Sequence, residues 1–449
     1  MNRKRFVVGL FAVVGACGDD GVNHLADAPL PPDVIDAPSC PLVTGTGTMH
    51  GGSVAAAETW TALGSPHILP FDTSINAAVT IEKCAVVRIA AGKQISVAAG
   101  GSITTQGIAG QPVTIEKKDA AAWVNIRTLN GGKVSFTHTT IDGGGDPLNG
   151  IAVVAGALDI AGTTPIAAGI IHADHLTVTS SKSSGITLHD GGGFDATSTD
   201  VTVSGSTHFA MATFARLLDT IPTGTYTGNS IDEILVRGTG GPEAMVEGGT
   251  IHERGVPYRI GYQAGSVLDL GGVTGLATVT IEPGVTLKFA PDAKMRIDAA
   301  AATTPARAAL IAVGTAAKKI TFTSASANPV PGEWYGLWFG STVNPTTRLD
   351  HVKVLFAGKA SVSGSDSCVP AGQTVPNDAA IRIIGGEPPA GFITNTEIKS
   401  SGFHGIDRGF RSDTKPSFLA TNDIVVATGC RETHPRDISG ACPTTPPCP

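Results

Sequence analysis

The chain repeats part of its own sequence, and this duplication restricts the folds that it can adopt. Residues 79–90 read VTIEKCAVVRIA, and residues 279–290 read VTIEPGVTLKFA. The same order continues downstream, because KSSG at 182–185 recurs at 399–402. Collinear matches of this kind are hard to obtain by chance and predict an internal repeat. We expect two related units, over about 45–210 and 247–430, joined by a less regular stretch.

Within each unit the apolar residues recur with the period of β-strands. Val285, Leu287 and Phe289 alternate with polar residues. This period of two predicts strands of about three to five residues, each with one buried and one exposed face. The 57 Gly and 29 Pro residues interrupt such segments and leave no long amphipathic helix. Two segments, 54–63 and 214–219, are expected to form short helices that cap or bridge the strands.

Short strands of this kind can build a sandwich, a propeller or a solenoid. Signals for two-residue hairpins are scarce, which argues against an antiparallel sandwich. No repeat near the propeller period of about 45 residues is present. In a parallel solenoid, each winding stacks on the previous one about 4.8 Å away, and the inward aliphatic side chains form ladders. A chain that is 41% hydrophobic but only 5% aromatic suits such ladders, so we expect a solenoid.

The second unit carries motifs that suggest a family. After IEPG at 281–284 come KKITFTS at 318–324, GEWYGLWFG at 332–340 and TTRLDHVKVLFAG at 346–358. This series resembles the right-handed parallel β-helix repeat lipoproteins of the bacterial cell surface. The first unit departs from it, with Lys83-Cys84 where the second has Pro-Gly. The resemblance implies an all-β fold, a right-handed parallel β-helix built from two tandem units with short capping elements.

The N-terminus predicts export and a lipid anchor. Arg3, Lys4 and Arg5 precede an apolar run over 6–16 that is too short to span a bilayer and suits a signal peptide. The run ends at Cys17 and resembles the bacterial lipoprotein signal, which implies that this thiol takes a diacylglyceryl group and that membrane lipid is a partner. A plain secretory signal with an incidental Cys is the alternative. By analogy, Gly18 after the lipidated Cys favours the outer membrane.

An acidic, Pro-rich stretch follows the anchor and is expected to stay extended, because its prolines and like charges oppose a packed core. The domain organisation that we expect is a signal peptide over 1–16, the lipidated Cys and tether over 17–44, the first β-helix unit with its irregular connection over 45–246, the second unit over 247–430, and a Cys/Pro-rich tail over 431–449.

The remaining cysteines fit an exported protein. Six Cys are left after Cys17, an even number that suggests three disulfides in an oxidising compartment. They are Cys40, Cys84, Cys368, Cys430, Cys442 and Cys448. We favour Cys40–Cys84, with the last four pairing among themselves. A zinc site is the alternative, but no CxxC pair is present, so we assign no metal.

The sequence offers surface-site candidates but no complete catalytic set. A β-helix hydrolase needs paired carboxylates, and Asp-Asp occurs only in the tether. The candidates are Asp142, Asp146, His172, Asp174 and Asp190, whose acids would gather on one groove in an enzyme. His172 and Asp174 share a strand face and could ligate one metal ion; a solvated polar face is the alternative.

Two pairs of residues recur in both units and are expected to be structural. Asp190 and Asp407 fall in LHDGGG and GIDRGF, and their repetition suggests a turn role. Trp123 and Trp334 recur as strand residues and are expected to be packing anchors.

The net charge of the chain narrows the classes of function that it can have. With 31 Lys and Arg against 38 Asp and Glu, the net charge of −7 argues against nucleic-acid binding. No cofactor is implied. We expect a lipid-anchored protein of the bacterial cell envelope with a scaffold, adhesion or glycan-binding role, and polysaccharide as a possible partner. The alternative is an envelope polysaccharide lyase or glycoside hydrolase.

Overall fold

The structure is a computed structural model that describes residues 39–145, 155–163, 170–189, 191–237, 242–273, 275–298, 307–340, 342–361, 378–442 and 448–449. The contacts divide the chain into Met1–Ser39 and Cys40–Pro449, and every described strand belongs to the second unit. No helix in the described part is both long and apolar enough to cross a membrane. The predicted anchor Cys17 lies outside the described residues.

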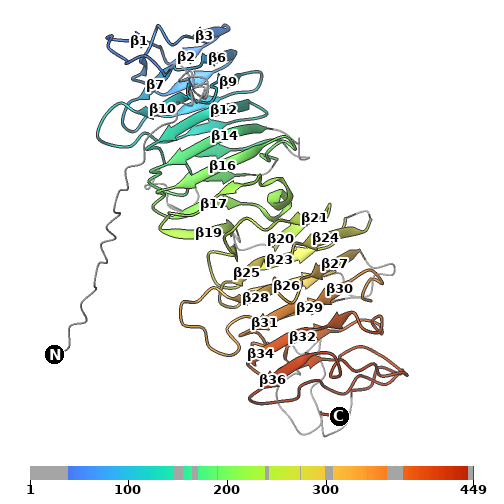
Figure 1. Cartoon of the computed structure of the whole chain (residues 1–449). Coiled ribbons are helices and arrows are strands. Elements are labelled where there is room, and N and C mark those ends of the chain that lie inside the picture. Colours follow the sequence, from blue (N-terminus) through green and yellow to red (C-terminus); the bar gives the residue numbers. More distant parts are fainter. Residues whose placement is uncertain are drawn as a thin grey trace, which may run out of the picture. The chain divides into compact units, whose positions relative to one another are not determined.

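Four sheets contain all the named strands (Figure 1). The 11-stranded sheet contains β1 (Thr48–Met49), β3 (Glu58–Trp60), β4 (His67–Leu69), β6 (Ala78–Glu82), β7 (Val86–Ile89), β9 (Ser102–Gln106), β10 (Val113–Lys117), β12 (Lys133–Asp142), β14 (Ile171–Thr179), β16 (Thr199–Ser204) and β18 (Gly224–Thr225). The 14-stranded sheet contains β2 (Ser53–Val54), β5 (Thr73–Ile75), β8 (Ile95–Val97), β11 (Ile126–Thr128), β13 (Leu158–Ile160), β15 (Ile186–Leu188), β17 (Phe209–Thr213), β19 (Ile231–Val236), β22 (Tyr258–Ile260), β25 (Thr286–Phe289), β28 (Ile320–Ser324), β31 (Val352–Leu355), β34 (Glu397–Ser401) and β36 (Asp423–Val426).

The other two sheets belong to the second half of the chain. The 6-stranded sheet contains β20 (Pro242–Met245), β23 (Val267–Leu270), β26 (Lys294–Ile297), β29 (Gly336–Phe339), β32 (Ala379–Ile383) and β35 (His404–Asp407). The 5-stranded sheet contains β21 (Gly249–Ile251), β24 (Ala277–Ile281), β27 (Ala308–Val313), β30 (Arg348–Asp350) and β33 (Ile393–Thr394).

Each strand pairs in parallel with the strand one winding later, as β22, β25 and β28 do. One antiparallel bridge, between Ile108 and Gln111, is isolated from the named strands. The chain therefore folds as a parallel β-helix, which confirms the predicted all-β solenoid. Isolated parallel bridges from Ile406 to Glu432 and from Arg411 to Arg436 carry the pairing into the predicted C-terminal tail.

The core is a set of aliphatic and aromatic ladders inside the windings. Tyr258, Leu287, Phe322, Val354 and Ile398 lie in register on five successive strands, and each is at most 1% exposed. The polar residues between them point outward, as the period of two predicts. Burying each such side chain contributes about 1.5–3 kcal/mol, so the ladders supply the main stabilisation of the fold.

The internal repeat is visible in the hydrogen bonds at the corners. Trp123 Nε1 donates to the carbonyl of Asp142, and Trp334 Nε1 donates to the carbonyl of Leu355, both at 2.9 Å. Both indoles are 0% exposed, which confirms that they are packing anchors. The expectation that they are strand residues is wrong, because they precede β11 and β29. The Phe289 ring stacks on Trp334, with 4.1 Å between the centroids.

One detail of the predicted alignment is wrong. Ser181 Oγ donates to the carbonyl of Ser184, and Ser401 Oγ donates to the carbonyl of His404. These matching turns make Ser181 the counterpart of Ser401, three residues out of step with the alignment of the two KSSG strings. Ser and Gly are frequent at such corners, so a short string of them matches in the wrong register.

Equivalent strands of the two halves lie in different sheets. β7 belongs to the 11-stranded sheet, whereas its counterpart β25 belongs to the 14-stranded sheet. The shift arises where β19 pairs with β22 and two new sheets begin with β20 and β21. The 3₁₀-helix η2 (Ala215–Thr220), with Leu217 and Leu218 buried, precedes this junction. It confirms one predicted short helix; the other, over 54–63, is wrong because β2 and β3 occupy that segment.

Disulfides link both ends of the folded body to its windings. Cys40 is bonded to Cys84, the pairing favoured from the sequence, and Cys430 is bonded to Cys448. Cys442 is also disulfide-bonded, and Cys368 lies outside the described residues. Disulfides of this kind stabilise a fold largely by restricting the unfolded chain.

In the first windings, one ladder of inward side chains ends with histidines. His67 is in register with Val87 of β7 and is 3% exposed. Its Nε2 donates to the carbonyl of Thr61 at 2.9 Å, so Nδ1 of the neutral ring accepts from His50 Nε2, also at 2.9 Å. His50 Nε2 and His67 Nδ1 can share one proton, but protonation of both atoms would place two N–H groups face to face. The histidine pair therefore cannot hold both rings in the charged form.

We predict that acid loosens these first windings. Burial lowers the pKa of both His50 and His67, and Glu58 opposes this effect more weakly. Because both pKa values are depressed in the folded state, their contribution to stability is present above about pH 6.5 and is lost as the pH falls below it. Hydrogen exchange of the amides of residues 48–69, corrected for intrinsic rates, should show weaker protection at pH 5 than at pH 7.5.

His67→Gln should reduce this pH dependence, because glutamine does not titrate. His208→Gln, a substitution outside the cluster, should leave it unchanged. Equal protection at both pH values in the wild-type chain would contradict the prediction.

Candidate functional site

The acidic candidates from the sequence do not converge in the described part of the chain. Asp142 ends β12 and is in register with Thr179, the last residue of β14. Asp174 lies on β14 before the corner residue His175, on a different face of the winding. Asp146 and Asp190 lie outside the described residues. The expected groove of gathered carboxylates is therefore not formed by Asp142 and Asp174.

His172 and Asp174 bind separate partners. His172 Nδ1 lies 3.0 Å from Asp195 Oδ2, whereas Asp174 Oδ1 lies 2.7 Å from His175 Nδ1. His175 has a positive φ of 55° and lies at a corner, where its ring turns back to Asp174. Among the described residues, no group of three or more His, Cys, Asp or Glu side chains is arranged to hold a metal ion.

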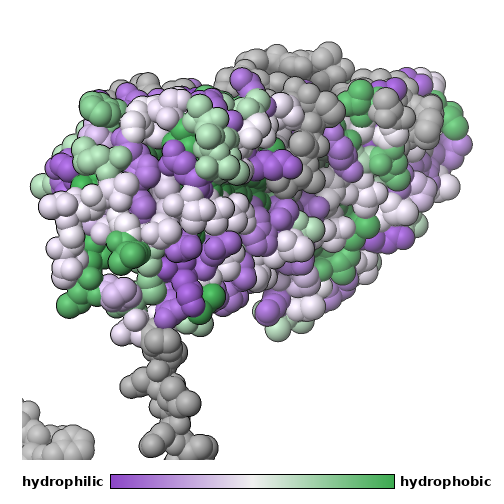
Figure 2. All heavy atoms as spheres, turned by 90° about the horizontal axis from the view of Figure 1, so that it is seen from above, coloured by the Kyte–Doolittle hydropathy of each residue, from purple (hydrophilic) through white to green (hydrophobic). Residues whose placement is uncertain are grey.

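A hydroxyl ladder runs along the outer face of the 11-stranded sheet. Five threonines lie in register on five successive strands and point outward: Thr114, Thr140, Thr177, Thr202 and Thr225. On the side of the molecule seen in Figure 2, hydrophilic and hydrophobic residues are interspersed in small patches. The first half thus presents the polar strand faces that the sequence predicts.

A pocket of about 370 Å³ opens at a corner of the second half, where the 14-stranded sheet turns into the 6-stranded sheet. The charged residues of its lining are Asp378 and Lys359, and its aromatic residue is Phe403. Lys359 Nζ is paired with the carboxylate of Asp292. The complete lining is Pro331, Gly332, Gly358, Lys359, Ala360, Asp378, Gly402 and Phe403.

Glycines from three windings form the floor of this pocket. A Cβ on Gly402 would lie only 2.7 Å from the Cα of Gly332 and from the carbonyl oxygen of Gly358. Gly358 has a φ of +80°, and a Cβ there would lie 2.3 Å from Ser401 Oγ. Any side chain at these positions would push the windings apart, so the pocket depends on bare backbone at its base.

Asp378 is fixed in place by a neighbouring loop. Its two carboxylate oxygens accept hydrogen bonds from Ser361, one from the hydroxyl at 2.7 Å and one from the backbone N–H at 2.9 Å. Burial, the largest effect, raises the pKa of Asp378 despite these hydrogen bonds. The pocket thus contains a carboxyl group that is more easily protonated than usual.

A buried charged cluster lies directly behind Asp378. Arg382 Nη1 lies 3.7 Å from Asp378 Oδ1, and Arg382 Nε lies 3.9 Å from Asp407 Oδ2. The guanidinium carbon lies 4.2 Å from the centroid of the Trp338 ring, a cation–π contact. Asp378, Arg382 and Asp407 are each at most 2% exposed. The cluster connects the pocket wall to the interior of the C-terminal windings.

The predicted turn role of Asp407 is wrong. Asp407 lies on β35, in register with Arg382, and is 1% exposed. The pKa of its carboxyl group is raised to about 7, because burial outweighs the attraction of Arg382 and the hydrogen bond from Thr433. The sequence match of Asp407 to Asp190 therefore does not indicate a turn at Asp407.

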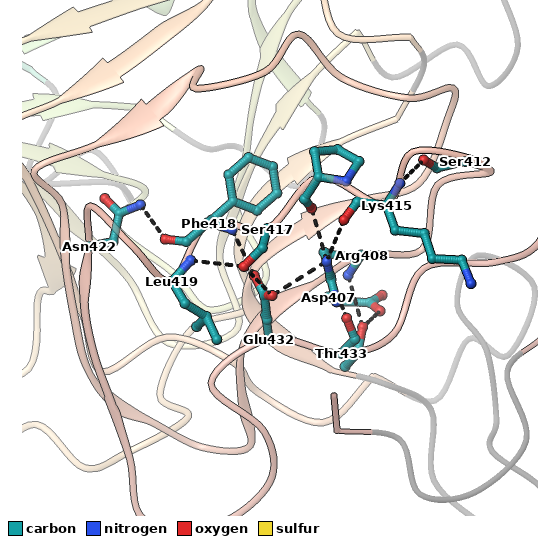
Figure 3. A network of polar contacts seen from close by, with 11 residues as sticks. Asp407, Arg408, Ser412, Lys415, Ser417, Phe418, Leu419, Asn422, Glu432 and Thr433 are labelled. Atoms are coloured by element: carbon teal, nitrogen blue, oxygen red, sulfur yellow. Dashed lines mark hydrogen bonds and ion pairs between the residues drawn. The ribbon is translucent and has the colours of Figure 1, made fainter.

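The last turns cover this cluster with a polar network (Figure 3). Thr433 Oγ1 donates to Asp407 Oδ1 at 3.1 Å, and Arg408 Nε donates to the carbonyl of Thr433. Arg408 is also paired with Glu432, which accepts from the hydroxyl of Ser417. These contacts hold the loop after β35 against the end of the solenoid and keep water from Asp407.

Sequence reasoning missed the pocket residues Lys359, Asp378 and Phe403. Lys359 and Asp378 lie 19 residues apart between β31 and β32, and Phe403 lies between β34 and β35, so no local spacing connects them. A weak signal was available at Arg382, a single cation within the apolar run AAIRIIG. A charge in a fully buried strand requires partners from elsewhere in the fold.

No protein-family model, no curated protein and no solved structure matches the chain.

We predict that Asp407→Asn changes the pH dependence of stability. Because the pKa of Asp407 is raised in the folded state, its contribution is fully present below about pH 4 and is lost as the pH rises through about 7. The asparagine is neutral throughout, so the variant should lose less stability than wild type between pH 5 and pH 8. Urea unfolding followed by tryptophan fluorescence measures the difference.

Asp413→Asn, at an exposed position of the neighbouring loop, is the matched control and should behave as wild type. An unchanged pH dependence in Asp407→Asn would show that this carboxyl group does not titrate in the range.

Proposed function

We propose that the chain is an exported, lipid-anchored protein of the bacterial cell envelope whose β-helix binds a glycan. Cys17 after a signal-like run supports the anchor, and the acidic, Pro-rich segment after it suits a tether. The disulfides of the folded body suit an oxidising compartment. The resemblance to bacterial surface lipoproteins supports the outer membrane as the location.

The observation that carries glycan binding is the lining of the corner pocket. Sugars offer apolar C–H faces and many hydroxyl groups, so their sites combine an aromatic surface with hydrogen-bonding side chains. Phe403 supplies the aromatic surface, Asp378 accepts hydrogen bonds and Lys359 donates them. The volume of about 370 Å³ lies within the range of small-ligand sites. We therefore assign this pocket to one sugar unit of a longer chain.

The outer faces of the solenoid support a long ligand. The hydroxyl ladder repeats at the spacing of the strands, about 4.8 Å, and offers donors and acceptors along one direction. A surface that only contacts solvent does not need hydroxyl groups aligned in register. An extended glycan lying on the β-helix can use these groups in addition to the pocket.

The anchor is tested by Cys17→Ser. We expect the variant to move from the membrane fraction to the soluble exported fraction, because one acylated Cys carries all of the proposed membrane affinity. Fractionation with metabolic labelling by a palmitate analogue measures both the location and the lipid. A variant that stays in the membrane fraction would show that lipidation of Cys17 is not the anchor.

Glycan binding is tested with the purified full chain in mild detergent against a panel of neutral and acidic polysaccharides. Phe403→Ala should weaken binding of the best ligand by about tenfold, the equivalent of about 1.4 kcal/mol, because it removes the aromatic wall. Phe71→Ala is the matched control, since Phe71 is 59% exposed in the first windings, and it should bind as wild type. Failure of the whole panel to bind would contradict the proposal.

Product release is scored separately in the same panel. Asp378 belongs to the pocket lining, so it is the carboxyl group that a hydrolytic alternative would use as its acid. Cleavage that disappears in Asp378→Asn would make the chain a glycoside hydrolase or lyase. Binding without cleavage supports the non-catalytic proposal.

A further inference from the structure

The second half carries a basic face on the 14-stranded sheet. The face consists of the cations on, or directly before, five successive strands, β22 to β34: Arg259, Lys288, Lys319, Lys353 and Lys399. Each cation is next to a core residue that points inward. The cations therefore point outward, on the opposite side of the sheet from the core ladder.

Three carboxylates pair with this face, and two of them, Glu233 and Glu397, are shielded from solvent. Glu233, with a side chain only 9% exposed, lies 2.7 Å from Lys288 and 3.5 Å from Arg259. Glu397, 22% exposed, is paired with Lys319, which lowers its pKa and keeps it ionised. Lys399, 41% exposed, lies 2.8 Å from Asp423, which is 57% exposed. Five cations against three carboxylates leave the face positive.

The excess of positive charge is confined to the basic face, because the whole chain has fewer cations than carboxylates. The sequence contains 31 Lys and Arg against 38 Asp and Glu. The matching outer face in the first half carries the hydroxyl ladder instead. Cations gathered on one face of an acidic protein create a local potential that attracts polyanions.

The geometry of the face suits a linear polymer. Five strands at about 4.8 Å spacing extend over about 19 Å. Thr286, Thr321 and Thr323 lie on the outward side between the cations and add hydroxyl groups for hydrogen bonding. Gly402 of the corner pocket directly follows β34, and Gly358 comes three residues after the end of β31, so the pocket adjoins one edge of the basic face.

We propose that the basic face and the corner pocket together bind an acidic linear glycan, one that carries carboxylate or sulfate groups along its length. This inference rests on the proposed glycan binding and names the class of glycan. The ammonium and guanidinium groups contact the anionic substituents, the threonine hydroxyls contact the sugar hydroxyls, and one sugar unit occupies the pocket. A nucleic acid fits less well, because single-stranded binders interleave exposed aromatic rings with their cations and this face interleaves threonines.

The test compares polymers that share a backbone and differ in charge. Dextran sulfate is paired with dextran, and polygalacturonate with its methyl ester. We expect the full chain in detergent to bind the charged member of a pair at least tenfold more tightly, and the affinity to fall steeply as salt is raised from 0.05 to about 0.5 M, because salt screens the contacts. An oligothymidylate of similar length tests the alternative polyanion.

Lys353→Glu should remove most of this charge selectivity, and Lys353→Arg should retain it. Lys133→Glu, the same reversal on a strand of the first half, is the matched control and should bind as wild type. Retained selectivity in Lys353→Glu would overturn the assignment of the basic face.

The remaining outcomes separate the two proposals. Equal binding of the charged and uncharged members would overturn the acidic class and leave glycan binding intact. Binding of no glycan at all would overturn the proposed function and this inference with it. Oligothymidylate binding as tight as that of the acidic glycans would overturn the assignment to a glycan.

Discussion

Parallel pairing of each strand with the strand one winding later is the constraint on which the structure depends. It places every inward residue directly on its counterpart, so Leu287 packs between Tyr258 and Phe322 at the distance fixed by the backbone hydrogen bonds. The same spacing acts on the outer side, where it aligns threonines in the first half and places cations on successive strands in the second. Core and surface are therefore two sides of one repeat, and a change in the number of residues per winding alters only the corners.

This regularity explains why much of the fold could be predicted from the sequence. In a solenoid, alternation along the chain translates directly into burial, and Leu287 and Phe289 are indeed 0% exposed. The two tryptophans were interpretable because each occurs at the corresponding place in its unit, three residues before an aliphatic residue. An even count of cysteines in an exported chain was enough to predict disulfides. The pairing of Cys40 with Cys84 was a preference among several possible pairings.

The parts that could not be predicted depend on how windings meet rather than on any local pattern. The change of sheets between β19 and β22 follows from the path of the chain around η2, and no alternation encodes it. Asp407 stands in a Gly-rich string like that of a turn, yet its partner Arg382 belongs to the previous winding. The pocket is assembled from corners of three windings, so its residues share neither spacing nor composition in the sequence. Local periodicity thus identifies what is inside and outside, and the corners determine the chemistry.

The bond between Cys40 and Cys84 has a mechanical consequence. When tension is applied through the N-terminal segment, it enters the folded body at Cys40 and passes through the two sulfur atoms to Cys84. The intervening loop, which contains β1 to β6, bears no load. A solenoid pulled from its end would otherwise unzip one winding at a time, because only a few hydrogen bonds hold each terminal strand. The covalent shortcut instead transfers the force to β7, a strand with neighbours on both sides.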